Sequence, residues 1–424
     1  MIKSFMNNFI YTNKCEILFG DLPESEIAAA LKRHNAKKVL AVYGSGSVKR
    51  SGVLDKVLGA LRTDGITYIE YGGVVANPLV SHGLEGIKIA KAEKVDFILA
   101  IGGGSVIDEA KFIAVGAFGN QDAWELFKSG AEEISGALPV ASVLTIPAAG
   151  SECSTASVVR DDKTGIKYAI GNEHIRPRFA YINPRYCMTL PPAQVGYGAS
   201  DIFAHLLERY MSPQTNVTLT DRILEGAMCA MLEIAPKVYQ VQIKSCGENV
   251  AACESGTPLA RRTKNKNEKD KNYDDNDYQV WAEFCLLGTL AHNDTLDMGR
   301  AYQDWATHAI DNKLLSGIHN IAHGAGLAII FPAWMRYVSK TKPDKILQFS
   351  REVMGEESIE KGIGKLETWF RSIGLPKTLS EVNIDAESVK EDAKTVFSSA
   401  TLGDYGQLRI NDILAIIESC SGRY

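Results

Sequence analysis

Residues 96–114 read DFILAIGGGSVIDEAKFIA, and this stretch decides the fold. Residues 97–101 form a continuous apolar run that predicts a buried strand, and three glycines and a serine follow it directly. Apolar side chains then recur at helical spacing, which predicts a helix over 106–116. A strand, a glycine turn and a helix in succession are typical of a parallel sheet covered by helices.

The same pattern occurs elsewhere in the first 190 residues. Residues 39–43 (VLAVY) predict a buried strand that ends in GSGS at 44–47, and a helical repeat follows over 53–61. A strand at 68–71, a turn at 77–78, a helix at 80–93 and strand-like residues over 139–188 continue the alternation. We therefore expect a Rossmann-like α/β domain over residues 1–190.

The pattern changes at Leu190-Pro191-Pro192, and helical periodicity dominates from there on. We expect an all-α domain over residues 191–424. Its helices are expected at 194–211, 219–239, 278–293, 301–315, 323–338, 343–373 and 386–399.

Residues 241–277 interrupt this domain with a tract of lysine, asparagine, aspartate and glutamate (KNKNEKDKNYDDND). Such a tract cannot bury enough apolar surface to offset the entropy lost on ordering. We interpret it as a solvated, mobile insertion between two helices. A nucleic-acid-binding arm is the alternative, but acidic residues interleave with the basic ones.

Composition excludes several classes of function. The 424 residues carry a formal charge of −5, so no basic field attracts nucleic acid. The 8 cysteines are scattered singly, which is the pattern of reduced intracellular thiols. No apolar run is long enough for a spanning helix and no signal peptide is recognisable. We expect a cytoplasmic protein that binds neither nucleic acid nor membrane.

The two glycine-rich turns are candidate phosphate sites, because a helix N-terminus offers free N–H groups and glycine lets a ligand approach the backbone. Neither turn has the GxGxxG spacing. Ser105 and Asp108 also fit a capping box for helix 106–116, and capping is compatible with cofactor contact. The candidate residues are Gly44, Ser45, Gly46, Ser47, Gly102, Gly103, Gly104, Ser105 and Asp108.

The first of these turns bears on the choice of dinucleotide. A site for NAD usually has an acidic residue after an early strand, where it holds the ribose hydroxyls. Here the turn from Gly44 has no carboxylate, and Lys49 and Arg50 follow it. Nothing repels a 2′-phosphate, so the sequence favours NADP(H) over NAD(H).

A second group of residues has the chemistry of a metal site. Asp201 and His205 are four residues apart in a helical run, which places them on one helix face. On their own they fit a buried hydrogen-bonded pair equally well. However, His308, His319 and His323 lie close together further along the chain. One carboxylate with three imidazoles suits Fe²⁺ or Zn²⁺ better than Mg²⁺ or Ca²⁺.

Several ordered stretches, covering nearly the whole chain except about residues 240–277, resemble the iron-containing (group III) alcohol dehydrogenase family. The similarity is greatest to its NADPH-dependent, butanol dehydrogenase-like aldehyde reductase branch. The matching stretches are YGSGSVKRSGV (43–53), DFILAIGGGSVIDEAKFIA (96–114), LTIPAAGSECSTASVV (144–159), LPPAQVGYGASDIFAHLLERY (190–210), LLGTLAHND (286–294), QDWATH (303–308), HGAGLAIIFPAWMRYV (323–338) and RSIGLP (371–376).

The resemblance implies a dehydroquinate synthase-like architecture, in which a Rossmann-like domain and a helical domain flank a catalytic metal. It implies hydride transfer between a nicotinamide cofactor and small aldehydes or primary alcohols, often by a homodimer. NAD-preferring members carry aspartate where Gly44 stands, which again favours NADP(H). The implied metal ligands are Asp201, His205, His308 and His323, and further implied cofactor contacts are Thr145, Ser151, Ser154 and Lys167.

The chain departs from the family in two places. The family has a proton-relay histidine four residues after the third metal ligand, where this chain has Asn312. The interval from His308 to His323 is also one residue longer, and an insertion rotates a helix by about 100° unless a bulge or loop absorbs it. Gly317 is a place to absorb it, and His319 is a candidate relay.

These departures leave other functions open. One is a different reaction on the same scaffold, that of a glycerol-type polyol dehydrogenase or a dehydroquinate synthase-like lyase. Another is a catalytically impaired protein that still binds cofactor. The QDWATH stretch and the set of four ligands favour the alcohol dehydrogenase.

Overall fold

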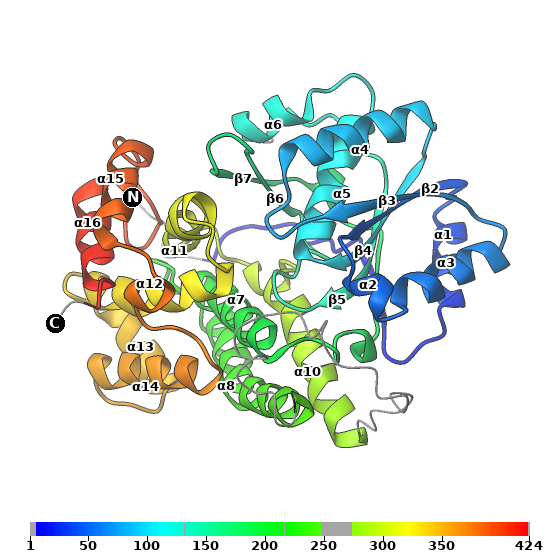
Figure 1. The fold of residues 1–424 in the computed structure, drawn as a ribbon. Coiled ribbons are helices and arrows are strands. Elements are labelled where there is room, and N and C mark those ends of the chain that lie inside the picture. The colour runs from blue at the N-terminus through cyan, green and yellow to red at the C-terminus, as the bar shows by residue number, and fades with distance from the viewer. Residues whose placement is uncertain (1–5, 131–132, 216, 247–273, 423–424) are drawn as a thin grey trace. The chain divides into compact units, whose positions relative to one another are not determined.

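The computed structural model describes residues 6–130, 133–215, 217–246 and 274–422 (Figure 1). The chain divides into two compact units. One unit comprises Thr12–Thr189 and Gly288–Asn293. The other comprises Leu190–Leu287 and Asp294–Tyr424, together with the N-terminal segment up to Tyr11. We propose that these units are the two domains expected from the sequence.

The first unit is built on a parallel sheet of six strands in the order β1-β8-β5-β4-β2-β3. This confirms the α/β class expected for the N-terminal part. The strands are β1 (Glu16–Phe19), β2 (Lys38–Gly44), β3 (Thr67–Val74), β4 (Phe97–Gly103), β5 (Val140–Ile146) and β8 (Phe179–Ile182), and a separate antiparallel pair is formed by β6 (Ala156–Arg160) and β7 (Lys167–Gly171).

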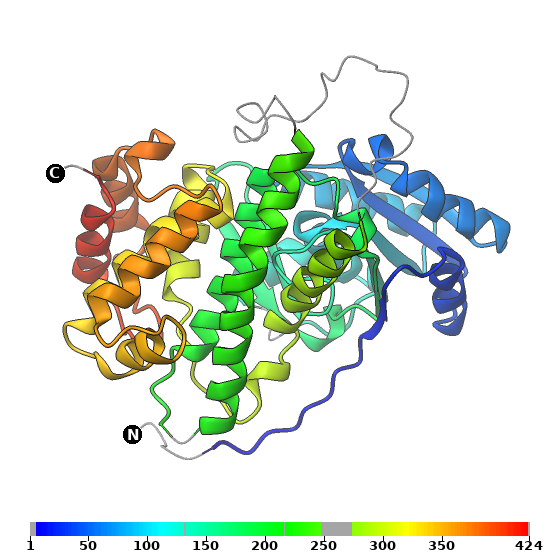
Figure 2. The same ribbon diagram turned by 90° about the horizontal axis from the view of Figure 1, so that it is seen from below.

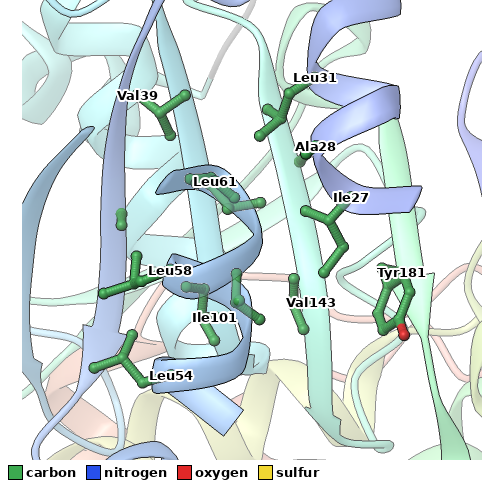
Figure 3. Packing of buried hydrophobic residues seen from close by; sticks show 14 of the residues in the cluster. Ile27, Ala28, Leu31, Val39, Leu54, Leu58, Leu61, Ile101, Val143 and Tyr181 are labelled. Carbon is green, nitrogen blue, oxygen red and sulfur yellow. The ribbon is translucent and has the colours of Figure 1, made fainter. Parts of the chain in front are cut away.

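Helices cover both faces of this sheet. Figure 3 shows side chains of α1 and α3, among them Ile27 and Leu58, packed over Val143 and Ile101 of the strands. Leu40 of β2 is fully buried but lies outside that cluster, as expected for a strand covered on both faces. The helices are α1 (Ser25–Arg33), α2 (Ser47–Arg50), α3 (Val53–Thr63), α4 (Val80–Ala92), α5 (Gly104–Ala117), α6 (Ala123–Ser129) and the short turns η1 (Glu173–Ile175) and η2 (Pro184–Tyr186).

The second unit is helical, as expected. Nearly every side chain of α7 is buried, and α7 packs against α8 and α12. The helices α8 and α14 lie side by side (Figure 2), where Trp369 Nε1 donates to the carbonyl of Leu232 at 3.2 Å. The elements are α7 (Pro192–Tyr210), α8 (Thr218–Cys246), α10 (Asp275–Ala291), η4 (Thr295–Asp297), α11 (Ala306–Ile310), η5 (Asp311–Ile318), α12 (His323–Ser339), α13 (Asp344–Glu352), α14 (Ile359–Ser372), η6 (Ser380–Val382), α15 (Ala386–Val396) and α16 (Ile410–Ser419).

Three expected boundaries are wrong. The helix expected over 301–315 begins only at Ala306 and changes into a π-helix at Asp311. The helix expected over 343–373 is two helices, and the side chain of Ser358 caps the second by accepting from the backbone N–H of Lys361. The proposed insertion is shorter than 241–277, because α8 continues to Cys246 and α10 begins at Asp275. Residues 247–273 lie outside the described residues.

Within the described parts of the chain, no helix combines the length and apolar character needed to cross a membrane.

Candidate metal centre and nucleotide site

Helix α7 supplies the first pair of predicted ligands. Asp201 and His205 are both buried, and the i, i+4 spacing brings Asp201 Oδ1 within 3.5 Å of His205 Nδ1. The long apolar runs of α7 bury this pair because the helix is surrounded by neighbouring helices. The pair therefore lies in the interior of the helical unit.

Two further histidines reach the same carboxylate oxygen from other elements. His308 on α11 places Nε2 at 3.5 Å from Asp201 Oδ1, and His323 at the start of α12 places Nε2 at 3.4 Å from it. Ligand atoms of Asp201, His205 and His308 all lie within 4.8 Å of one another. His323 belongs to the same cluster, because its Nε2 lies near Asp201 and its ring centroid is 5.2 Å from that of His308. The structure thus brings all four predicted ligands together.

The arrangement has the features of a cation site. Asp201 Oδ1 and His308 Nε2 are buried, and neither has a hydrogen-bond partner among the described residues. The nitrogen-to-oxygen distances of 3.4–3.5 Å exceed those of an ordinary hydrogen bond, which are about 2.7–3.2 Å. Burial would raise the pKa of Asp201, but His205 and His323 hold it well below its usual value. One carboxylate oxygen and three imidazole nitrogens fit Fe²⁺ or Zn²⁺.

Two other carboxylates contact the imidazoles of His308 and His323 on Nδ1, the ring nitrogen that does not face Asp201. Glu208 of α7 contacts Nδ1 of His308 and also accepts from its backbone N–H at 3.1 Å, and Asp311 contacts Nδ1 of His323. Although burial would lower the pKa of His308, Glu208 and Asp201 raise it to about 10. A cation bound by the ring would take the place of the proton. Neither Glu208 nor Asp311 is among the site residues predicted from the sequence.

The interval between His308 and His323 contains a π-helix. Backbone N–H groups just after η5 donate five or six residues back, as from His319 N to Leu314 O at 2.9 Å and from Ile321 N to Leu315 O at 3.0 Å. A π-turn holds one residue more than an α-turn, so η5 offers room for the additional residue expected in this interval. Gly317 lies in its last turn, close to where the sequence placed the adjustment.

The candidate relay residue His319 has another partner. Its Nε2 lies 3.0 Å from Oδ2 of Asp392 on α15. Asn312, where the resemblance led us to expect a histidine, lies half-buried in η5. The relay role of His319 stays a prediction.

In the other unit, the glycines of the β4–α5 turn allow a strand and a helix to pack closely. Gly102 and Gly103 end β4, and Gly104 begins α5. A Cβ added to Gly102 would lie 2.5 Å from Val106 Cγ2, and one added to Gly103 would lie 2.8 Å from Ile146 Cβ. This turn and the one after β2 both follow the carboxyl ends of neighbouring parallel strands, the edge where such sheets bind nucleotides.

The capping box expected at Ser105 and Asp108 is wrong. The helix begins at Gly104, its N-cap is Gly103, and no side chain caps it. Ser105 Oγ instead accepts from the backbone N–H of Asn77 at 3.3 Å. Asp108 accepts from Ser151 Oγ at 2.6 Å, so it joins helix α5 to the loop that follows β5. Burial raises the pKa of Asp108 to about 6, against the lowering effect of Lys111.

Lys111, which the sequence did not single out, organises that loop. Its fully buried Nζ donates to Ser151 O and Oγ at 2.7 and 2.9 Å, to Ser154 O at 3.0 Å and to Ala156 O at 2.7 Å. Burial lowers the pKa of Lys111 to about 8, and Asp108 opposes this. Two of the predicted cofactor residues, Ser151 and Ser154, are thus held by one ammonium group.

The remaining predicted cofactor residues belong to the same unit. Thr145 of β5 and Lys167 of β7 are buried. Gly44 ends β2, and the helix α2 that follows it has only 4 residues. A Cβ added to Gly46 would lie 2.7 Å from Nη1 of Arg50, so this guanidinium lies directly over the GSGS turn containing Ser45 and Ser47.

Comparison with known protein families identifies both parts of the chain. A family described as iron-containing alcohol dehydrogenase matches residues 15–184. A second, described as the C-terminal part of the Fe-containing alcohol dehydrogenase family, matches residues 263–421.

Similar proteins cover almost the whole chain. A probable NADH-dependent butanol dehydrogenase of Bacillus subtilis is 33% identical over 98% of this chain and 100% of its own length. The NADPH-dependent aldehyde reductase YqhD of Escherichia coli is 34% identical over 91% of both chains. The crystal structure of NADH-dependent butanol dehydrogenase A from Thermotoga maritima has a TM-score of 0.85 and 32% identity, covering 98% of this chain and 99% of that one. With this coverage and its matching N- and C-terminal parts, the chain belongs to the iron-containing alcohol dehydrogenase family of NAD(P)-dependent oxidoreductases.

Proposed function

We propose that this protein interconverts small aldehydes and primary alcohols with a nicotinamide cofactor, and that Asp201, His205, His308 and His323 hold its metal. The observation that carries the proposal is the convergence of three imidazoles, from three separate elements, on one buried carboxylate oxygen. A divalent cation in this position supplies a Lewis acid for the substrate's carbonyl oxygen. The chain contributes the four donors and the buried surroundings that keep water from competing for them.

We propose that the cofactor binds against the carboxyl ends of the parallel strands in the α/β unit. The backbone N–H groups of the glycine turns would bind phosphate oxygens, and the buried loop after β5 would bind near the nicotinamide end. The proposed cofactor residues are Gly44, Ser45, Gly46, Ser47, Gly102, Gly103, Gly104, Ser105, Asp108, Thr145, Ser151, Ser154 and Lys167.

We propose NADP(H) as the preferred cofactor. Gly44 offers no carboxylate to a 2′-phosphate, and the Arg50 guanidinium over Gly46 offers a positive charge to it. The relatives do not decide the matter, because the butanol dehydrogenases of Bacillus subtilis and Clostridium acetobutylicum are named as NADH-dependent and YqhD as NADPH-dependent.

The substrate class proposed here is that of short unbranched aldehydes such as butanal, the aldehyde that corresponds to the alcohol named in several relatives. A homodimer and a cytoplasmic location stay predictions.

The test is to replace His205 or His323 by alanine and to measure metal content and aldehyde-dependent NADPH oxidation on the same sample. Each variant should lose bound metal and activity together, because each removes one of four donors. His174→Ala is the control, since His174 is exposed and belongs to the α/β unit. Full activity in a variant without metal would reject the proposal.

Two further measurements complete the assignment. His319→Ala should keep its metal, and a change in the pH profile of kcat would support the relay role. A substrate panel should include glycerol and 1,3-propanediol beside butanal. A strong preference for a polyol would replace the alcohol dehydrogenase assignment with that of a polyol dehydrogenase.

A further inference from the structure

We propose that Asp311 is a positioning residue for His323, and that the π-helix η5 exists in this chain to bring the Asp311 carboxylate to that ring. This inference rests on the metal site proposed above and concerns how one of its donors is held. Asp311 itself touches neither the cation nor the substrate in this scheme.

The contacts of Asp311 support this role. Asp311 is completely buried, and its Oδ2 accepts both from Nδ1 of His323 and from Ser316 Oγ, the latter at 2.5 Å. Its Oδ1 is buried without a hydrogen-bond partner among the described residues. The carboxylate also packs closely against the backbone of Gly326 on α12, since a Cβ added to this glycine would lie only 1.8 Å from Oδ1. Only glycine at 326 leaves room for Asp311.

The π-helical register makes this contact available. Ser316 Oγ donates to both the carbonyl and the carboxylate of Asp311, five residues earlier. In an α-helix, residues five apart point about 140° away from each other. In a π-helix the i and i+5 positions are joined by the backbone hydrogen bond and share a face. The π-helical register therefore creates the pair of Asp311 and Ser316.

The chemistry follows from what a carboxylate can do. A carboxylate oxygen accepts hydrogen bonds, so contact with Asp311 would keep the His323 proton on Nδ1 and leave Nε2 to donate its lone pair to a cation held beside Asp201. A carboxylate partner also makes the imidazole a stronger donor to a cation. Glu208 makes the same contact with Nδ1 of His308, but from α7. Two imidazoles of the site are thus oriented by carboxylates from two different elements.

The first experiment compares Asp311→Asn with Asp392→Asn. Both change an aspartate that contacts a histidine in the helical unit, but Asp392 contacts His319, outside the group of four donors. Affinity for Zn²⁺ is measured by competition with a chelator. The absorption spectrum of the Co²⁺-loaded protein reports the geometry of the donors independently of activity. Asp311→Asn should weaken Zn²⁺ binding by about 10–100-fold and alter the Co²⁺ spectrum, while Asp392→Asn should change neither.

A second pair of variants moves Asp311 without removing it. Gly326→Ala should displace the carboxylate and weaken Zn²⁺ binding in the same direction. Gly364→Ala is its control, because a Cβ there meets nothing within 4 Å and the residue lies in helix α14. If Asp311→Asn fails to fold, this pair still tests the inference.

The outcomes separate the inference from the function on which it rests. If the unaltered protein binds neither Zn²⁺ nor Co²⁺, the proposed metal site is wrong. Suppose instead that the unaltered protein binds both ions. If the Zn²⁺ affinity of Asp311→Asn or Gly326→Ala is then within twofold of that of the unaltered protein, and its Co²⁺ spectrum is unchanged, Asp311 does not position His323. Loss of affinity in the Asp392→Asn control would also overturn the specific role given to Asp311.

Discussion

Lys111→Met tests the account of the loop that follows β5. Methionine keeps most of the apolar stem of lysine but removes every donor. In the structure, the Lys111 ammonium is completely buried and donates to four acceptors in residues 151–156. The substitution should therefore leave three backbone carbonyls and the Ser151 hydroxyl without their donor, in a place that water does not reach.

The expected loss of stability follows from the acceptors that lose their donor. An ammonium carries three N–H groups, so the four acceptors share them. A buried acceptor left unpaired costs about 1–3 kcal/mol, and the three backbone carbonyls together give about 3 kcal/mol at the lower end of that range. The lower end applies because methionine also removes the cost of burying the charge, the effect that lowers the pKa of Lys111 to about 8.

The assay is scanning calorimetry of Lys111→Met beside the unaltered protein, in the absence of cofactor. A loss of about 3 kcal/mol lowers the melting temperature of a domain of this size by about 6–12 °C. Lys88→Met is the matched control, because the Lys88 side chain is 74% exposed and its ion pair with Glu85 contributes little. The reasoning is refuted if Lys111→Met melts within about 2 °C of the unaltered protein, as the control should.

Three further predictions concern pH, cofactor and metal. Burial raises the pKa of Glu109 above its ordinary 4.5 despite the contact with His82, so the folded state holds this proton to higher pH than the unfolded chain does. The stability that protonated Glu109 contributes is therefore lost as the pH rises above 4.5. Glutamine cannot ionise, so the free energy of unfolding of Glu109→Gln, measured by urea titration, should rise relative to that of the unaltered protein as the pH increases from 4.5. A difference between the two proteins that does not depend on pH would contradict this. Gly44→Asp should shift the ratio of kcat/KM for NADPH and NADH toward NADH by about tenfold or more, because the new carboxylate would repel the 2′-phosphate of NADPH. An unchanged ratio would mean that the 2′-phosphate binds elsewhere. Removing metal with dipicolinate should abolish aldehyde reduction and lower the melting temperature, since a ligand at 100 times its Kd stabilises by about 2.7 kcal/mol, and Fe²⁺ or Zn²⁺ should restore both.

Patterns within short stretches of the sequence account for the parts of the fold that were predicted correctly. The run at 97–101 and the glycines after it identified strand β4 and the start of α5, because a buried parallel strand needs a continuous apolar run. The i, i+4 spacing of Asp201 and His205 was enough to place both on one face of α7. Their meeting with His308 and His323 was implied by the family resemblance and by no local pattern.

The features that the sequence predicted wrongly, or did not predict, depend mostly on partners far away in the chain. Asp108 was expected to cap its own helix, but it accepts from Ser151, 43 residues later. Lys111 reads as an ordinary helix residue, and only the loop folded over it shows why a lysine is there. The extra residue expected before His323 stays a prediction, and the sequence could not show that this interval would form a π-helix.

The sequence by itself identified the strand–turn–helix units at β2 and β4, the helical character of the second unit, and the side chains that have the chemistry of a metal site. Hydrophobic periodicity, turn residues and donor type are local properties, so they can be recognised before the chain folds. Only the tertiary structure decided that Glu208 and Asp311 stand behind two of the imidazoles. A buried carboxylate is stable only where distant groups supply its hydrogen bonds, and those groups come together only when the helices pack.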